Sequence, residues 1–181
     1  IDDLTERVRS SQRIQALAYY DELTGLANRR RLLEQVNVLF EQAKVQDEVG
    51  ALLFIDLDHF KNINDSLGHA AGDWVLQQVA ERLKPFFTKN DELARLGGDE
   101  FVALIQGPGN QAELLLLVKR LLRVIAKPVQ IRDLRLQVSA SIGMALYSPQ
   151  QDRDAAALLA RADEAMYRVK QQGKNGYWLL E

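Results

Sequence analysis

Cysteine is absent from this chain of 181 residues, which excludes disulfides, thiolate metal sites and cysteine nucleophiles. Histidine is nearly absent: the two present, His59 and His69, have no further histidine at ligand spacing, so a zinc site is not expected. No apolar run approaches the roughly 20 residues that cross a bilayer. Walker-type phosphate loops and the G-x-G-x-x-G fingerprint are also missing. Any nucleotide site must therefore be built in another way.

Basic and acidic residues are nearly equal in number, and the formal net charge is -2. That balance argues against a general nucleic-acid binder, although a few well-placed cations can still hold one triphosphate. With 47% hydrophobic and 27% charged residues, the profile is that of a soluble domain with one core. The chain opens at Ile1 without a methionine or a signal peptide. We therefore expect a cytoplasmic fragment without membrane contact, cut from a longer protein that could itself be membrane-anchored.

The first 20 residues are predicted to form a linker helix, and residues 21–181 the globular domain. Within the first 20 residues, side chains that would share one helix face recur at steps of three and four. All but Ser11 are apolar, and the series is Leu4, Val8, Ser11, Ile14 and Leu17. This stripe is narrow. It fits a helix that packs on a partner and, equally well, an ordinary surface helix.

The remaining pattern mixes strands with helices. An apolar run at 51–55 predicts a strand buried on both faces, and paired glycines between 93–96 and 101–105 predict a tight hairpin. Helices are expected at 29–46, 60–67, 72–84, 110–126 and 155–172, with Asn28, Asp58 and Asn110 as N-caps. Further strands are expected at 129–131, 134–146 and 177–180. The order favours an α+β fold, one mixed sheet flanked by helices.

Three carboxylates stand where ligands usually bind. Asp56 directly follows the buried strand, while Asp99 and Glu100 lie at the tip of the glycine hairpin. Carboxylates brought together there would repel one another unless a cation lay between them, and magnesium prefers a few carboxylates, water and phosphates. The pattern suggests a magnesium-nucleotide site. For Asp99 alone, a solvated turn residue is the simpler interpretation.

Two further segments could hold phosphates. Backbone N–H groups at the start of the helix near His59 and Phe60 could cradle them, and Lys61 could reach them. Lys170 and Lys174 lie four residues apart at a helix end, where lysines also simply complement the helix dipole.

Five ordered segments together resemble the GGDEF family of diguanylate cyclases, from about residue 21 to residue 176. They read DELTGL at 21–26, FIDLDHFKNIND at 54–65, RLGGDEF at 95–101, SIGMA at 141–145 and ADEAMY at 162–167. The resemblance implies a palm-like nucleotidyl cyclase fold with a mainly antiparallel five-stranded sheet. It also implies that a homodimer, with one GTP per domain, condenses two GTP into cyclic di-GMP and two pyrophosphates. The cofactor would be Mg²⁺, with Mn²⁺ as a substitute.

The same resemblance assigns roles to residues. Asp56, Asp99 and the Leu57 carbonyl would bind the metal, and Asp99 and Glu100 would be catalytic. Substrate contacts fall to a larger set: Asn64 and Asp73 at the guanine edge, and His59, Phe60, Lys61, Gly97, Gly98, Lys170 and Lys174 around the phosphates and ribose. A carboxylate suits guanine, which offers N1–H and an exocyclic amine, whereas adenine lacks that pair. Lys174 stands where arginine is frequent in the family. Lysine keeps the positive charge but cannot bind a phosphate through two parallel N–H groups as an arginine guanidinium does.

One departure concerns feedback. Many family members carry an inhibitory Arg-x-x-Asp site before the hairpin, and here those positions run from Thr88 to Asp91. The arginine is replaced, so product inhibition is expected to be weak or absent. The main alternative function is a non-catalytic GTP-binding domain that controls an adjacent phosphodiesterase domain. Sensor or phosphodiesterase domains are expected elsewhere in the parent chain. A cyclase that is silent as an isolated monomer is a related alternative. A polymerase-like or mononucleotide cyclase palm is more distant, because Asn64 and Asp73 speak against adenine substrates, and a structural linker leaves the placement of Asp56 and Asp99 unexplained.

Overall fold

A five-stranded sheet forms the centre of the computed structural model, which describes residues 3–46, 50–107, 110–147 and 152–180. The strands run in the order β2 (Glu92–Gly97), β3 (Glu100–Gln106), β1 (Gly50–Leu57), β6 (Ala140–Leu146) and β7 (Gly176–Leu180). Among the strand pairs of this sheet in the described residues, β6–β7 alone is parallel. The predicted mixed, mainly antiparallel sheet is therefore confirmed. A separate two-stranded ribbon joins β4 (Val129–Ile131) to β5 (Leu134–Leu136).

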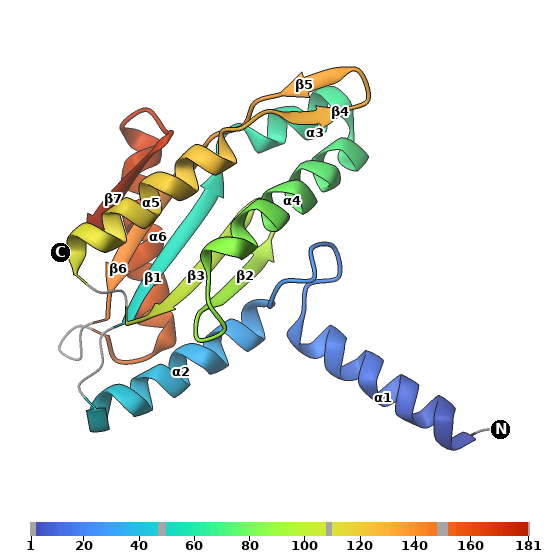
Figure 1. Ribbon diagram of the computed structural model, residues 1–181, viewed down its shortest axis with the longest axis vertical. Coiled ribbons are helices and arrows are strands. Elements are labelled where there is room, and N and C mark those ends of the chain that lie inside the picture. Colours follow the sequence, from blue (N-terminus) through green and yellow to red (C-terminus); the bar gives the residue numbers. More distant parts are fainter. Residues whose placement is uncertain (1–2, 47–49, 108–109, 148–151, 181) are drawn as a thin grey trace.

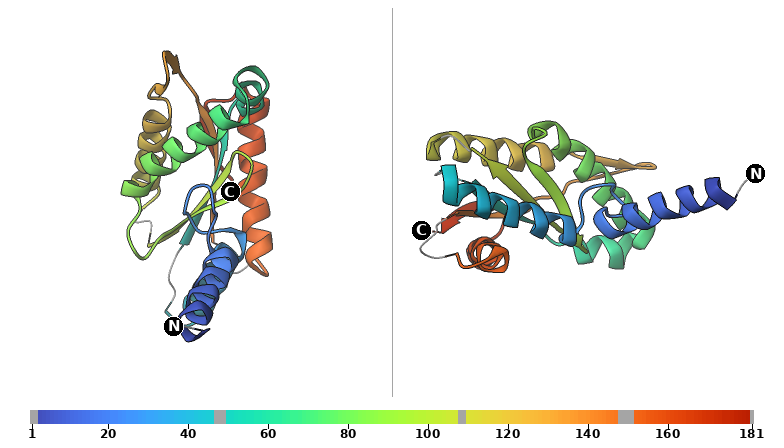
Figure 2. Two further views of the ribbon diagram at one scale, coloured as in Figure 1. Left: turned by 90° about the vertical axis from the view of Figure 1, so that its right-hand side faces the viewer. Right: turned by 90° about the horizontal axis from the view of Figure 1, so that it is seen from below.

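Helices cover both faces of the sheet. On one face lie α4 (His69–Leu83) and α5 (Gln111–Ile125), and on the other lie α2 (Arg29–Gln46) and α6 (Ala155–Gln171). Figure 2 shows α6 across the sheet from α4 and α5. The side chains of Ala51–Ile55 alternate between the two cores, and each is at most 3% exposed. The unbroken apolar run thus marks a strand buried on both faces, as expected.

Most predicted boundaries agree with the structure. The side chains of Asn28 and Asn110 accept hydrogen bonds from Arg31 N (3.0 Å) and Glu113 N (2.8 Å), so both N-caps are confirmed. The expected strand 134–146 is two strands, because β5 pairs with β4 outside the main sheet and only β6 joins β1. The helix expected from residue 72 begins earlier, at His69, directly after α3 (Phe60–Leu67) and Gly68.

The first helix, α1 (Asp3–Tyr19), extends away from the rest of the molecule (Figure 1). None of its residues is buried, and Leu4, Ile14 and Leu17 are 74%, 67% and 51% exposed. The narrow apolar stripe that the sequence predicts therefore faces solvent in the single chain. Among the described residues, no helix is long and apolar enough to cross a membrane.

Candidate functional site

The predicted carboxylates meet at one end of the sheet. Asp56, near the end of β1, lies directly opposite Glu100 in the register with β3, so both side chains emerge on the same face. Asp99 occupies the turn between β2 and β3, and its carbonyl accepts a hydrogen bond from Leu57 N at 3.3 Å. Strand pairing thus joins two motifs that lie more than 40 positions apart in the sequence.

Two carboxylates in this cluster interact strongly. The pKa of Asp56 is raised to about 7, first by burial and then by the charge of Asp99 and a hydrogen bond with it, while Lys170 partly offsets the shift. Such a pair either shares a proton or binds a cation. The arrangement therefore favours a positive ion between Asp56 and Asp99.

Glu100 lies in a second acidic setting, beside Asp163. Burial raises its pKa, the charges of Asp163 and Asp99 raise it further, and Arg29 lowers it. The Asp163 carboxyl also has a raised pKa because of burial. Arg29 and Asp163 line the same hollow as Glu100, between the starts of α2 and β3 and the middle of α6. Sequence analysis missed both, because they become neighbours of Glu100 only when the two helices pack on the sheet.

The hairpin is braced by Arg95, the residue that opens the RLGGDEF segment. Its Nε donates to the Gly98 carbonyl at 2.9 Å, and its NH1 group pairs with Asp21 Oδ1 at 2.9 Å. Gly97 and Gly98 have φ angles of 144° and 48°, which a side chain would disfavour. Both glycines are exposed, so their backbone is open to a ligand.

The region that follows β1 differs from the prediction. Asp58 is not the N-cap of α3: His59 takes that place with a φ of 58° and makes no side-chain cap bond. The Asp58 carboxylate turns instead toward β6 and α6, and only 3% of the residue is exposed. Burial would raise its pKa, but hydrogen bonds from Lys170, Ser139 and Ser141 outweigh it and hold that pKa below its usual value.

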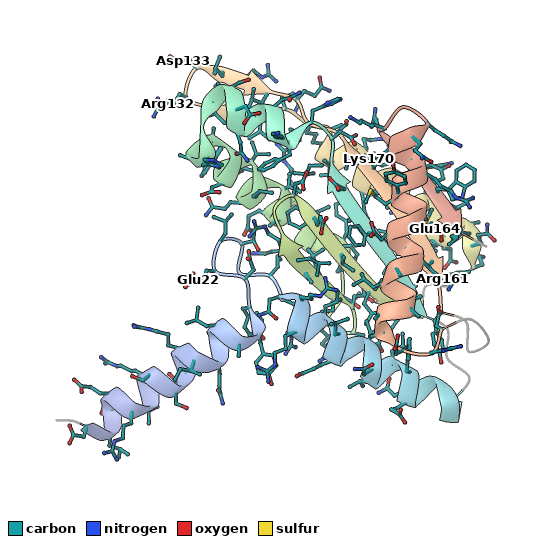
Figure 3. The ribbon with its side chains drawn as sticks, turned by 180° about the vertical axis from the view of Figure 1, so that it is seen from behind. Glu22, Arg132, Asp133, Arg161, Glu164 and Lys170 are labelled. Carbon is teal, nitrogen blue, oxygen red and sulfur yellow. The ribbon has the colours of Figure 1, made fainter. Side chains whose placement is uncertain are left out.

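Of the two lysines near the end of α6 that are expected to hold phosphates, Lys170 lies beside the carboxylates. Lys170, at the carboxyl-terminal end of α6 (Figure 3), places Nζ 2.7 Å from Asp58 Oδ1 and 3.4 Å from Asp56 Oδ1. The main interactions of Lys170 are therefore with these two carboxylates and not with the dipole of α6. Lys174 follows in a loop with a positive φ of 68°. Lys61 and His59 are exposed, whereas the Phe60 side chain is buried, so only its backbone could contact a ligand.

Asn64 and Asp73 come from two helices that pack together, α3 and α4. An added Cβ on Gly72 would stand 1.9 Å from Asn64 Oδ1 and 3.0 Å from Phe60 Cζ. The missing side chain at this position leaves room for the Asn64 carboxamide beside α4. Asp73, the next residue, is exposed. The packing thus brings Asn64 beside Gly72, one position before Asp73.

The carboxylate of Asp91 is already engaged within its own turn. Its Oδ2 accepts hydrogen bonds from Thr88 N at 2.9 Å and Thr88 Oγ1 at 3.2 Å, and its Oδ1 accepts one from Gln106 N at 3.2 Å. Threonine at position 88 therefore completes a local turn and presents a neutral side chain to Asp91.

A magnesium ion fits this donor set better than a metal bound wholly by protein. Within the described ranges, no cluster of three or more histidine, aspartate or glutamate side chains could hold a metal by itself. Magnesium usually takes one or two carboxylates and fills the remaining positions with water and substrate phosphates. The neighbouring carboxylates of Asp56 and Asp99 are two donors of the kind that such an ion takes.

Comparison with known proteins gives a family match over most of the chain. The sequence model of the family described as "Diguanylate cyclase, GGDEF domain" matches residues 18–176. MucR of Pseudomonas aeruginosa, a bifunctional diguanylate cyclase/cyclic di-GMP phosphodiesterase, is 42% identical over 98% of this chain. The diguanylate cyclase TpbB of the same species is 39% identical over 91%. The chain spans 26% of MucR and 38% of TpbB, so it corresponds to less than half of either relative.

A solved structure agrees with both the sequence match and the fold. The crystal structure of a sensory box/GGDEF family protein from Caulobacter crescentus superposes with a TM-score of 0.81 at 41% identity. The superposition covers 86% of this chain and 100% of that one.

Proposed function

The chain belongs to the GGDEF family of diguanylate cyclase domains, and on that premise we propose that it condenses two GTP molecules into cyclic di-GMP and two pyrophosphates. The observation that carries the proposal is the Asp56–Asp99 carboxylate pair, whose mutual repulsion favours a cation beside a lysine able to hold phosphate. The GG-D-E-F segment is intact, which favours catalysis over a purely regulatory role.

We assign metal binding to Asp56, Asp99 and the Leu57 carbonyl, with Mg²⁺ as the cofactor and Mn²⁺ as a substitute. A bound magnesium would neutralise negative charge on the phosphates as the bond to pyrophosphate breaks. Because Asp56 must lose its proton to act as a ligand, and its pKa lies at about 7, metal affinity should rise as the pH increases toward that value.

The remaining roles follow the positions of the side chains. Lys61, Lys170 and Lys174 supply positive charge near the triphosphate, together with backbone N–H groups at His59 and Phe60. Gly97 and Gly98 allow the ribose or phosphates to approach the hairpin. The raised pKa of Glu100 suits a group that accepts the proton of the attacking 3′-hydroxyl.

Catalysis requires two domains that face each other. The product has two-fold symmetry and each domain would hold one GTP, so an isologous dimer is the simplest arrangement. The exposed apolar stripe of α1 is a candidate for holding that dimer together. Sensor or phosphodiesterase domains in the parent chain would then control how the two domains meet.

The proposal is tested by incubating the concentrated chain with GTP and magnesium and identifying the product by mass spectrometry. Cyclic di-GMP from the native chain, and none from an Asp99→Ala variant, is the expected result. GTP binding without product, in a sample shown by light scattering to be dimeric, would indicate a regulatory GTP-binding domain instead.

Replacing Asp73 by serine should relax the preference for GTP over ATP. The aspartate is expected to accept hydrogen bonds from guanine N1–H and the exocyclic amine, and charged hydrogen bonds of this kind are worth about 10- to 100-fold in discrimination. The ratio of kcat/KM for GTP and ATP measures the effect. The neighbouring exposed Asp65, exchanged for serine, is the control. An unchanged ratio in Asp73→Ser would remove the residue from base recognition.

Cyclic di-GMP should bind weakly, if at all, at the turn that contains Asp91. The carboxylate already accepts three hydrogen bonds from Thr88 and Gln106, and position 88 offers no cation to the product phosphates. Calorimetric titration with cyclic di-GMP is the measurement. Restoring the charge with Thr88→Arg should strengthen binding by about tenfold or more. Tight binding to the native chain that Asp91→Ala abolishes would contradict the prediction.

A further inference from the structure

Asp58 is a buried carboxylate to which the proposed mechanism gives no task. Only 3% of the residue is exposed, yet it accepts four hydrogen bonds from three separate segments. Oδ1 accepts hydrogen bonds from Ser141 Oγ (2.7 Å) and Lys170 Nζ (2.7 Å). Oδ2 accepts them from Ser139 Oγ (2.6 Å) and the Asn175 backbone N–H (3.0 Å).

The first consequence concerns the ammonium group of Lys170. It lies 2.7 Å from Asp58 but 3.4 Å from Asp56, so the closer contact is with the carboxylate that is not a metal ligand. A lysine paired fully with Asp56 would occupy the position where a cation must bind. Asp58 therefore competes with Asp56 for the same ammonium group.

The second consequence concerns the loop after α6. Lys174 and Asn175 are consecutive non-glycine residues with positive φ angles of 68° and 48°, a conformation that side chains disfavour. The Asn175 N–H bond to Asp58 and the Lys174 N–H bond to the Val169 carbonyl (2.9 Å) fix this loop. The backbone that presents Lys174 is thus tied to the same buried carboxylate.

We propose that Asp58 is a positioning residue, which holds Lys170 away from Asp56 and fixes the Lys174 loop, so that Asp56 stays available to a divalent cation and both lysines face the triphosphate. Its role in catalysis rests on the proposed function, whereas its hold on Lys170 can be measured without any nucleotide.

Asp58→Asn is the informative substitution because it preserves shape. An amide has one acceptor oxygen, and its NH₂ group cannot accept from Lys170 or from the Asn175 N–H. The two serine hydroxyls can rotate to suit an amide, but the two obligatory donors cannot. The variant should therefore release Lys170 or the loop without opening a cavity.

The first experiment is lysine acylation with mass-spectrometric mapping, without GTP or metal. In Asp58→Asn the labelling of Lys170 should rise several-fold, because the closer of its two carboxylate contacts is lost and only the one with Asp56, at 3.4 Å, remains. The labelling of the exposed Lys61 and Lys119 should stay constant. Ser139→Ala, which removes one hydrogen bond to the same carboxylate, is the matched control and should leave Lys170 protected. Unchanged Lys170 labelling in a folded Asp58→Asn chain would overturn the proposal.

A second variant decides the question even if Asp58→Asn does not fold. Asp56→Asn removes the more distant carboxylate and leaves Asp58 in place. Lys170 should then remain as protected as in the native chain. A several-fold rise in its labelling would show that Asp56, and not Asp58, holds the ammonium group, and would contradict the proposal.

The kinetic experiment separates positioning from a general loss of stability. In Asp58→Asn the magnesium concentration for half-maximal cyclic di-GMP formation should rise on the order of tenfold, because the released Lys170 competes for Asp56. The double variant Asp58→Asn/Lys170→Met is compared with Lys170→Met alone. Its half-maximal magnesium concentration should rise no further, since no ammonium group remains to compete for Asp56. A full additional rise in the double variant would mean that Asp58 acts only through stability. A native chain that is dimeric and binds GTP but makes no product would refute the proposed function, and the labelling result would still decide the role of Asp58.

Discussion

Exchange of Asp99 for asparagine is expected to reduce cyclic di-GMP formation by about a thousandfold or more. The carboxylate contributes one of only two acidic side chains at the proposed metal site, and an amide oxygen offers no negative charge to replace it. Steady-state product formation at saturating magnesium and GTP measures the effect. The fold should survive, because the side chain sits in a turn and is partly exposed.

The same variant has a second readout that needs no substrate. The charge of Asp99 and its hydrogen bond to Asp56 raise the Asp56 pKa, so their loss should lower that pKa from about 7 toward its ordinary value. A carbon-13 NMR titration of the Asp56 carboxyl group would follow the shift. Asp133→Asn, at the exposed tip of the β4–β5 ribbon (Figure 3), is the control for both measurements. Near-native turnover in Asp99→Asn would remove this residue from metal binding.

The positions of the carboxylates at strand ends follow from local patterns, whereas their meeting depends on strand pairing. An apolar run that ends at Asp56 and a glycine pair that precedes Asp99 each mark a strand end, and the long-range pairing of β1 with β3 brings Glu100 opposite Asp56. Strand ends and tight turns are encoded by neighbouring residues, so this part of the site could be predicted. Element boundaries were less predictable, since residues 134–146 look like one strand until two different pairing partners divide them.

Asp58 shows where local patterns fail. An aspartate just before a helix is usually an N-cap, and its sequence neighbours give no other signal. Its actual partners, however, lie 81 to 117 positions away along the chain. For the same reason, the sequence suggests that Lys170 complements a helix dipole, whereas in the structure its ammonium group contacts two aspartates. The pairing of β1 with β6 and the docking of α6 on the sheet together create these interactions.

Replacing Gly143 by alanine should destabilise the domain by about 3 kcal/mol. Gly143 lies in β6 directly beneath α6, and an added Cβ would stand 2.1 Å from Met166 N and 2.2 Å from the Ala162 carbonyl oxygen. These are backbone atoms, so no side-chain rotation can relieve the overlap. The helix would have to move away from the sheet, and it carries Lys170 with it.

Gly176 provides the matched control in the neighbouring strand β7. An added Cβ there would meet only Val169 Cγ1 at 3.6 Å and the Lys174 carbonyl oxygen at 3.8 Å, which are ordinary contacts. Urea unfolding followed by tryptophan fluorescence should therefore show a large decrease in the free energy of unfolding for Gly143→Ala and a small decrease for Gly176→Ala. Equal stabilities would mean that α6 can shift freely on β6. In that case the close approach of helix and strand would not be what sets the distance between Lys170 and the two aspartates.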